Sequence, residues 1–348
     1  MLFLIMIVNL ISDTVTKPSN KMLEAMLSAE VGDDVFKEDP TVNDFEEKVA
    51  SLFEKEAALF FPSGTMTNQT AIKIHTQPGE QIICDHYSHI FNYEGGGVSF
   101  NSGVSCKMIS GDRGRITADQ IIESINPPDF YHSPKTSLVC LENTTNKGGG
   151  AIYDLNEIVR IRELCSKKKL GLHLDGARLW NALEVTNENP KQYGELFDTI
   201  SLCLSKGLGC PVGSVLVGSK KNIDKALRIR KVFGGGMRQA GYLAAAGSYA
   251  LKHHRRDLNS DHRKAKEIAI ALKKCSYVNE INPVETNIII FSLKNQYDEV
   301  TFVEKLKNKN ILIMSLGKGK LRMVTHRDYT DDQHTYLLKI LTKIEYSD

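Results

Sequence analysis

Residues Ser201 to Gly209 read SLCLSKGLG, an apolar run that ends on Ser205 and Lys206 and then meets glycines. Such a run is typical of a buried β-strand that breaks into a turn. A lysine at the carboxyl end of a strand can be partly desolvated by the sheet, which lowers its pKa and frees its neutral amine for an aldehyde cofactor. A solvated lysine in an ordinary turn is the alternative, and this stretch alone does not separate the two.

Strand-like and helix-like runs alternate on the amino-terminal side of Lys206. We predict strands over residues 57–62, 81–84, 137–141, 171–175 and 199–205, and helices over residues 67–75, 88–93 and 155–168. Strands separated by helix-length segments indicate a mostly parallel sheet that is covered by helices on both faces. Ligands of such sheets bind beyond the carboxyl ends of the strands, which is where Lys206 falls.

The pattern changes after residue 241, where a stretch rich in Ala, Lys and Leu predicts helices over residues 242–252 and 261–274. Further on we predict strands over residues 287–293, 311–315 and 320–324, with helices over residues 300–307 and 331–344. These elements indicate a small α+β domain. We place the boundary near residue 250, so that residues 1–250 hold the amino-terminal segment and large domain, and residues 251–348 the small domain.

Composition limits the class of protein. The chain has 348 residues, of which 41% are hydrophobic and 25% charged, and its formal net charge is +2. An ordinary globular composition without a basic stripe disfavours nucleic acid as a partner, so we expect a small-molecule ligand. The apolar residues 1–8 meet Asn9 and Asp13 too early to span a membrane. We expect a buried first strand or an overlong start there, and no membrane partner.

The cysteines indicate the cellular compartment. The seven cysteines are odd in number, form no CxxC pair and mostly lie in apolar runs. This usage predicts free core thiols in a reducing compartment, and we expect a cytoplasmic protein.

Two other turns carry groups that suit an aldehyde cofactor with a ring and a phosphate. Asp175 ends a strand-like run, where an aspartate can pair with a pyridinium nitrogen or simply cap the following helix. Residues 59–69, LFFPSGTMTNQ, run from a strand through Ser63, Gly64 and Thr65 into a helix. Free amides at that helix start would bind a phosphate, with a plain helix cap as the alternative. No Gly-Lys-Ser/Thr follows, which disfavours a nucleoside triphosphate.

Residues 85–89, DHYSH, place two histidines and an aspartate close together. The group can be mistaken for a metal site, but it directly follows a strand and no third ligand is indicated nearby. We therefore expect no metal. His89 is better placed to stack on an aromatic cofactor ring.

These pieces belong to a set of motifs that resembles the L-threonine aldolases, pyridoxal-phosphate enzymes of fold type I. The motifs are SDTVTKP (12–18), VGDDVF (31–36), EDPT (38–41), PSGTM (62–66), HLDGAR (173–178), CLSKGL (203–208) and GGGMRQ (234–239). The resemblance runs in the family's order from about residue 8 to the carboxyl terminus. It implies an α/β fold in which a large domain with a mostly parallel seven-stranded sheet is joined to a small carboxyl-terminal α+β domain.

The resemblance also implies roles for individual residues. Lys206 would hold pyridoxal 5'-phosphate as a Schiff base, Asp175 would pair with the ring nitrogen, and His89 would stack on the ring. The cofactor-binding set comprises Ser63, Gly64, Thr65, His89, Asp175, Arg178, Ser205 and Lys206, with Lys231 and Arg238 reaching in from a neighbouring subunit. The substrate carboxylate would be held by Ser12, Arg178 and Arg322, since a planar guanidinium can make two parallel bonds to a carboxylate. His89 and His132 are the candidates for the base.

The implied reaction cleaves L-threonine or L-allo-threonine to glycine and acetaldehyde. A β-eliminating lyase, or another fold type I enzyme acting on a different amino acid, is the closest alternative, because the same groups serve several reactions. A noncatalytic pyridoxal-phosphate-binding protein is a further one. Family members assemble as tetramers built from dimers with shared active sites, so we expect the same here.

The chain departs from the family's pattern at two positions. Ile11 stands where many relatives carry arginine, which removes a charge from a strand expected to be buried. Thr145 stands where they usually carry histidine, which removes a pocket imidazole and can alter the preference for the β-side chain or between threo and allo substrates.

Overall fold

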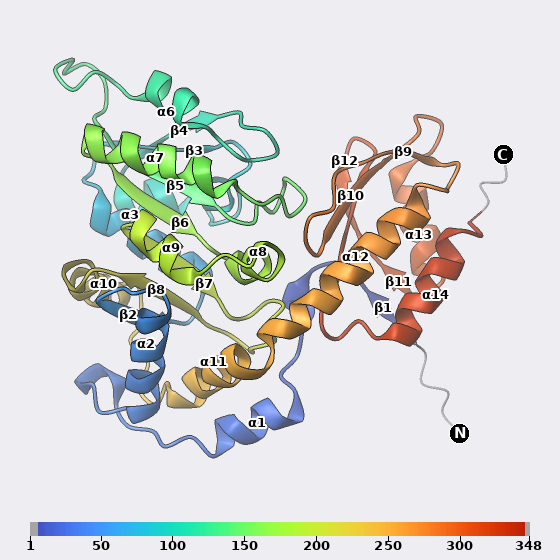
Figure 1. Cartoon of the computed structure of the whole chain (residues 1–348), viewed down its shortest axis with the longest axis horizontal. Helices are drawn as coiled ribbons and strands as arrows, with labels where there is room; N and C mark the ends of the chain where they lie inside the picture. Colours follow the sequence, from blue (N-terminus) through green and yellow to red (C-terminus); the bar gives the residue numbers. More distant parts are fainter. Residues whose placement is uncertain (1–5, 345–348) are drawn as a thin grey trace.

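The computed structural model describes residues 6–344, and its largest element is a seven-stranded sheet in the order β2-β8-β7-β6-β5-β3-β4 (Figure 1). The strands are β2 (Ala57–Phe61), β3 (Gln81–Asp85), β4 (Ser105–Ile109), β5 (Thr136–Glu142), β6 (Gly171–Asp175), β7 (Thr199–Cys203) and β8 (Ser214–Gly218). Six of these seven strands run in one direction, and β8 runs antiparallel to both of its neighbours, β2 and β7. The predicted mostly parallel seven-stranded sheet is thus confirmed.

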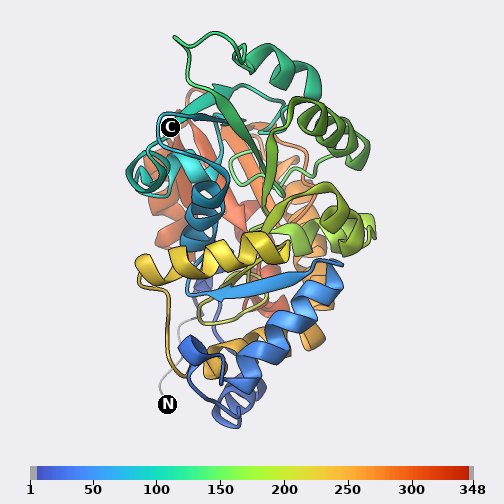
Figure 2. The same cartoon turned by 90° about the vertical axis from the view of Figure 1, so that its left-hand side faces the viewer.

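Helices cover both faces of this sheet, as Figures 1 and 2 show. Side chains alternate along β5: Val139 and Leu141 join the core on one face, and Leu138 and Cys140 the core on the other. The first face is covered by α2 (Pro40–Leu52), α7 (Leu155–Lys168), α8 (Leu179–Thr186), α9 (Pro190–Leu196) and α11 (Gly241–His253). The second is covered by α3 (Gly64–His75), α5 (Gly97–Ser102) and α10 (Lys220–Val232). Burial on both faces explains why the strands read as nearly continuous apolar runs.

A smaller, four-stranded antiparallel sheet lies to the right in Figure 1, in the order β12-β13-β10-β9. Its strands are β9 (Val278–Ile281), β10 (Ile288–Leu293), β12 (Met314–Gly317) and β13 (Lys320–Val324). It packs with α12 (Leu258–Leu272), α13 (Glu299–Lys307) and α14 (Asp331–Leu341) in a second core. The small α+β part was therefore predicted correctly in kind.

The amino-terminal segment packs with this second core. β1 (Val8–Asn9) pairs in parallel with β11 (Ile311–Leu312), and Val8 and Leu10 are fully buried there. The sequence placed this segment with the large domain, because a short strand does not reveal its partner. Residues 1–5 of the predicted first strand lie outside the described residues, and the division near residue 250 stays a prediction.

Two strands of the large sheet were missed by the sequence reasoning. β4 lies at the sheet edge and leaves several side chains exposed, so its sequence SCKMI lacks an apolar run. β8 follows the glycine-rich turn after Lys206 within a few residues, which left no helix-length spacer to mark a new strand. The predicted strand 311–315 is in fact split between β11 and β12.

Within residues 6–344, no helix combines the length and the apolar character that crossing a membrane requires. All seven cysteines are free, and five of them are buried. Free core thiols are as predicted, whereas the compartment stays a prediction.

Candidate active site

Charged side chains from neighbouring strands meet at the carboxyl edge of the large sheet. Glu142 ends β5 and Asp175 ends β6, and the two residues are paired in register. Lys206 follows the end of β7, close enough to Asp175 for the carboxylate to influence the pKa of its ammonium. The structure therefore brings Lys206 and Asp175 to one place.

Asp175 is buried, and both of its carboxylate oxygens accept hydrogen bonds. The Ala177 amide donates to Oδ1 at 3.1 Å, and Asn68 Nδ2 donates to Oδ2 at 2.9 Å. Asn68 lies on α3, so it joins Asp175 to the helix that starts at the Ser-Gly-Thr turn. Burial lowers the pKa of His173 to about 4, so its neutral ring can donate through Nε2 to Asn68 Oδ1 at 3.2 Å. Asp175 does not cap α8, which begins at Leu179.

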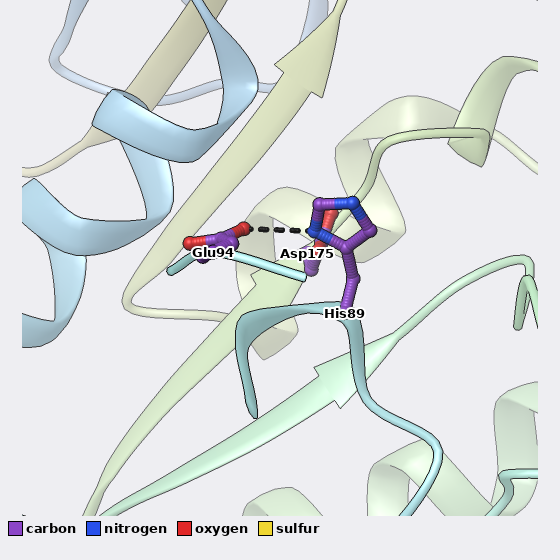
Figure 3. A group of neighbouring side chains, drawn as sticks. All are labelled: His89, Glu94 and Asp175. Atoms are coloured by element: carbon purple, nitrogen blue, oxygen red, sulfur yellow. Dashed lines mark hydrogen bonds and ion pairs between the residues drawn. The ribbon is translucent and has the colours of Figure 1, made fainter. Parts of the chain in front are cut away.

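His89 begins α4 (His89–Asn92) and lies beside Asp175 and Glu94 (Figure 3). Its Nδ1 is 3.0 Å from Oε1 of the buried Glu94. Burial lowers the pKa of His89, but the hydrogen bond to Glu94 and the charge of Asp175 raise it by more, so the net shift is upward. The side chain is 35% exposed, which leaves part of the ring accessible to a flat ligand.

The same three side chains have the geometry of a metal-binding group. Polar atoms of His89, Glu94 and Asp175 lie within 4.8 Å of one another. Asn68 donates to both carboxylates, however, and Gln69 Nε2 donates to Glu94 Oε2 at 2.6 Å. Because these oxygens already accept amide hydrogens, the group is arranged to hold a histidine rather than a cation. The absence of a metal stays a prediction.

The surroundings of Lys206 correct one expectation. Burial lowers the pKa of its ammonium, but Cys203 and the carboxylates of Asp13 and Asp175 raise it, and the net shift is upward. The predicted lowering of this pKa is wrong, because nearby negative charge outweighs desolvation. The backbone is fixed by Thr16, whose Oγ1 donates to the Lys206 carbonyl at 2.7 Å.

The Ser63-Gly64-Thr65 turn serves as a helix cap and also leaves amides free. Ser63 is the N-cap of α3, and its Oγ accepts the Met66 amide at 3.2 Å. The amides of Gly64 and Thr65 have no acceptor within residues 6–344. A Cβ on residue 64 would lie 2.6 Å from Cys203 Sγ, so a larger residue would fit only if the Cys203 side chain moved. Free amides at the positive end of a helix suit a phosphate.

Arg178 and Asp13 form a buried bidentate ion pair. Nε and Nη2 of Arg178 each donate to Asp13 at 2.7 Å. Burial raises the pKa of Asp13, but the charge and hydrogen bonds of Arg178 lower it by more, so it lies well below its usual range. One edge of the Arg178 guanidinium is thus used by Asp13. Its Nη1 has no hydrogen-bond partner among the described residues, so this atom can still donate to an anion.

Arg322, on β13, is the second guanidinium near this place. Its Nη1 donates to Asn146 Oδ1 and its Nη2 to the Ile11 carbonyl, each at 3.0 Å. Its Nε is buried and has no partner in the described part of the chain. Burial and the nearby charge of Arg178 lower the pKa of Arg322. A carboxylate placed between the two arginines would relieve both conditions, which fits the predicted role.

Ser12 and Ser205 lie next in sequence to these groups. Ser12 precedes Asp13, and its Oγ accepts the Thr14 hydroxyl at 2.8 Å. Ser205 precedes Lys206 and is half-buried. Both lie at the edge of the site, without a contact that assigns either one a role.

Three predicted residues are not brought to this site by their own chain. His132 is exposed and precedes β5, so it lies at the amino edge of the sheet, opposite Lys206. Its own chain therefore does not bring His132 beside Lys206, and its role as a base stays a prediction. Lys231 is exposed in the last turn of α10, and Arg238 pairs with Asp33 at 2.8 Å. Their contribution to a neighbouring subunit stays a prediction.

The two departures from the family's pattern have structural settings. Thr145 Oγ1 donates to the Arg113 carbonyl at 2.8 Å, and the side chain packs so closely on Gly148 that no Cβ fits there. The Thr145 side chain therefore packs within a turn and holds it to the Arg113 backbone. Ile11 is half-buried and lies just after β1. An arginine at this position would therefore not lie within a strand.

Sequence reasoning missed four buried groups of the site: Asp13, Asn68, Glu94 and Glu142. Residues 67–70 form a fully buried polar run one turn after the predicted phosphate turn, and this run was the available signal for Asn68. No signal marked Glu94, because its partners lie on other elements.

Comparisons with known proteins agree with this geometry. A family model described as β-eliminating lyase matches residues 9–296. The low specificity L-threonine aldolase of Escherichia coli (strain K12) is 38% identical over 94% of this chain and 96% of its own length. The corresponding Saccharomyces cerevisiae protein is 39% identical over 91% of this chain and 82% of its own length. Low-specificity L-threonine aldolase 1 of Arabidopsis thaliana is 38% identical over 95% of this chain and 94% of its own length.

Solved structures share the fold at lower sequence identity. The Leishmania major threonine aldolase superposes with a TM-score of 0.84 at 21% identity, covering 97% of this chain and 99% of that one. The serine palmitoyltransferase of Sphingomonas wittichii superposes with a TM-score of 0.75 at 16% identity, covering 97% of this chain and 86% of that one. Since the sequence similarity spans nearly the whole chain, the protein belongs to the β-eliminating lyase family and, within it, to the low-specificity L-threonine aldolases.

Proposed function

We propose that this protein is a pyridoxal-phosphate-dependent lyase that cleaves L-threonine or L-allo-threonine to glycine and acetaldehyde. The observation that carries the proposal is that Lys206 lies close to a carboxylate, Asp175, and to a guanidinium, Arg178, which in turn lies close to a second guanidinium, Arg322. One side suits a ring nitrogen and the other a carboxylate. Several fold type I reactions share these groups, and the similarity to L-threonine aldolases favours this reaction among them.

The residues present fit the cofactor. The amides of Gly64 and Thr65, with the Ser63 hydroxyl, would bind its phosphate. Asp175 would hold the ring nitrogen, and the accessible part of His89 would contact the ring. Once joined to the substrate amine, the cofactor supplies a sink for the electron pair that the broken bond leaves on Cα.

The arginines would set the orientation of the substrate. Arg178 Nη1 and Arg322 Nε are the donors that remain without a partner on two buried guanidiniums, and both would bind the substrate carboxylate. A carboxylate held from this side fixes which bond at Cα faces away from the ring plane, and therefore which bond breaks. Ser12, next to Asp13, would complete this binding place.

His89 would accept the β-hydroxyl proton, directly or through a water. Its Nδ1 is engaged by Glu94, so Nε2 is the nitrogen that can take the proton. Because the pKa of His89 is raised, the base form is populated only above that pKa, and activity should increase as the pH rises through it.

We also propose an assembly of four chains as two dimers with shared sites. Lys231 and Arg238 lie beside exposed apolar residues, Val232 (76% exposed) and Phe36 (70%). An exposed apolar patch flanked by cations suits a subunit interface. The free cysteines support a cytoplasmic location, where the reaction would break down threonine and supply glycine.

The function can be tested by measuring acetaldehyde after incubation with L-threonine and with L-allo-threonine separately. Wild type and the control Lys48→Ala, at a lysine 62% exposed on α2, should form acetaldehyde, whereas Lys206→Ala should not. Equal activity in Lys206→Ala would overturn the mechanism. Pyruvate with ammonia would instead support a β-eliminating lyase. A visible band trapped on Lys206 by borohydride, without turnover of any hydroxy-amino acid, would support a noncatalytic binding protein.

A further inference from the structure

Glu142 is a buried carboxylate beside the site that the reaction just proposed does not use. It ends β5 in register with Asp175 and is 7% exposed. Burial and the charge of Asp175 raise its pKa to about 7. Two carboxylates side by side in a buried place cost free energy, so a compensating role for Glu142 is to be sought in its hydrogen bonds.

One oxygen of Glu142 fixes the residue that would stack on the cofactor. Oε2 accepts the backbone amide of His89 at 2.8 Å. His89 opens α4, whose N-cap residue Ser88 makes no side-chain capping bond. Glu142 therefore supplies the acceptor that the chain itself lacks at this helix start, and holds the backbone from which the imidazole projects.

The other oxygen leads to the residue that would hold the substrate carboxylate. Oε1 accepts the backbone amide of Asn146 at 2.7 Å. The side chain of Asn146 then accepts from Arg322 Nη1 at 3.0 Å. Arg322 lies on the small sheet, so this path crosses from the large part of the protein to the small one.

We propose that Glu142 is a positioning residue that sets both halves of the site: His89 through Oε2, and Arg322 through Oε1 and Asn146. The inference rests on the proposed function, because it assigns cofactor contact to one half and substrate binding to the other. In this proposal Glu142 acts through the His89 and Asn146 backbone, whose amides its two oxygens accept, and not by contacting a ligand. Its removal should therefore weaken cofactor and substrate binding together, while removal of the Asn146 side chain should affect the substrate alone.

Three variants separate the two connections made by Glu142, which we call the His89 arm and the Arg322 arm. Glu142→Ala loses both acceptors, and we expect about tenfold weaker pyridoxal-phosphate binding to the apoprotein and about tenfold higher KM for L-threonine. Asn146→Ala keeps its amide on Glu142 but releases Arg322, so only KM should rise, by a similar factor. In the double variant, KM should equal that of Glu142→Ala, since both changes act along one path. If Glu142→Ala does not fold, Glu142→Gln replaces it, because one amide oxygen can serve only one arm.

The matched control is Glu46→Ala on α2. Glu46 is also a buried carboxylate that accepts a backbone amide, that of Phe60 at 2.8 Å, and burial raises its pKa too. It should lower the thermal unfolding temperature and leave cofactor affinity and KM unchanged. If Glu142→Ala behaves in the same way, Glu142 is a structural anchor only and the inference is wrong. An equal loss of cofactor affinity in Asn146→Ala would also overturn it.

Failure of the function and failure of this inference remain distinguishable. Cofactor affinity is measured by titrating the apoprotein and following its fluorescence, which needs no turnover. If wild type forms no acetaldehyde, the proposed reaction fails, but the His89 arm is still tested by this titration. The Arg322 arm is then tested by the concentration of glycine that half-saturates the change in the cofactor's visible absorbance.

Discussion

The two sides of the site differ in how completely their polar groups are paired. On the cofactor side (Asn68, His89, Glu94 and Asp175), every carboxylate oxygen accepts a hydrogen bond. On the carboxylate side (Asp13, Arg178 and Arg322), Arg178 Nη1 and Arg322 Nε have no partner among residues 6–344. The carboxylates on the cofactor side are thus fully paired before a ligand binds, whereas the two arginines on the carboxylate side each keep a donor without an acceptor.

The sides also differ in charge. The cofactor side carries two carboxylates against one histidine, and the carboxylate side two guanidiniums against one carboxylate. A substrate joined to the cofactor is charged in the complementary sense, with a protonated ring nitrogen at one end and a carboxylate at the other. Charges that are fixed in place before binding need no reorganisation during the reaction, which is how such sites lower a barrier.

The largest expected effect comes from removing the only carboxylate, Asp13, that pairs with an arginine on the carboxylate side. Asp13→Asn leaves the buried Arg178 without its counter-charge, and we expect a loss of about 3 kcal/mol or more in the free energy of unfolding. Thermal unfolding measures it. As a control, Asp44→Asn breaks an exposed pair with Lys48 and should cost less than about 1 kcal/mol. An Asp13→Asn variant as stable as the control would contradict the comparison.

The contribution of Asp13 to the pH dependence of stability should disappear in the same variant. Because the folded-state pKa of Asp13 is held below its unfolded value, its contribution to stability is present above the ordinary pKa of an aspartate. The contribution is lost as the pH falls below that value. Wild type should therefore lose stability more steeply than Asp13→Asn in acid.

A change on the cofactor side should spare stability and impair catalysis. Asp175→Asn keeps the shape of the side chain but removes the charge and one of the two acceptors, so we expect kcat to fall by about 10²–10³-fold while pyridoxal phosphate still binds. Steady-state kinetics and cofactor stoichiometry measure the two effects. Asp198→Asn is the control, since Asp198 accepts the Leu172 amide at the opposite edge of the sheet. An Asp175→Asn enzyme with full kcat would show that the ring nitrogen lies elsewhere.

A smaller effect is expected when the charge is kept and the geometry is lost. Arg322→Lys retains a cation but cannot hold Asn146 and Ile11 at once and still face a carboxylate. KM for L-threonine should rise by about tenfold, with kcat little changed. Arg263→Lys, at an arginine that is 52% exposed on α12, is the control. A large fall in kcat without a change in KM would place Arg322 at the reacting bond instead.

The contrast between the two sides also explains what the sequence could predict. Lys206 and Asp175 end apolar strands, and Ser63 to Thr65 begin a helix, so local patterns mark the cofactor side. The sheet was predicted for the same reason, since its strands are buried on both faces. Local periodicity is strongest where one element buries itself completely.

The carboxylate side is assembled from segments far apart in the chain. Arg178 meets Asp13, and Arg322 meets Asn146, through contacts that no local pattern encodes. The rise in the Lys206 pKa has the same origin, because it depends on the charge of Asp13, which acts against the lowering that burial causes. Only the family's motifs indicated Arg178 and Arg322. They did not reveal that Asp13 accepts hydrogen bonds from two of the Arg178 nitrogens.

The smallest effect is expected from His132, one of two histidines that the sequence treated alike. His89 lies on the cofactor side and should cost about 10²–10⁴-fold in kcat when changed to Ala, as expected for a general base. His132 is exposed at the opposite edge of the sheet, near Phe130 and Tyr131, so His132→Ala should change kcat by less than about twofold. If His132→Ala were as impaired as His89→Ala, the ring would have to act in another chain's site, because its own chain holds it on the wrong edge of the sheet. Mixing inactive Lys206→Ala chains with His132→Ala chains would then restore activity, since a shared site could draw each intact residue from a different subunit.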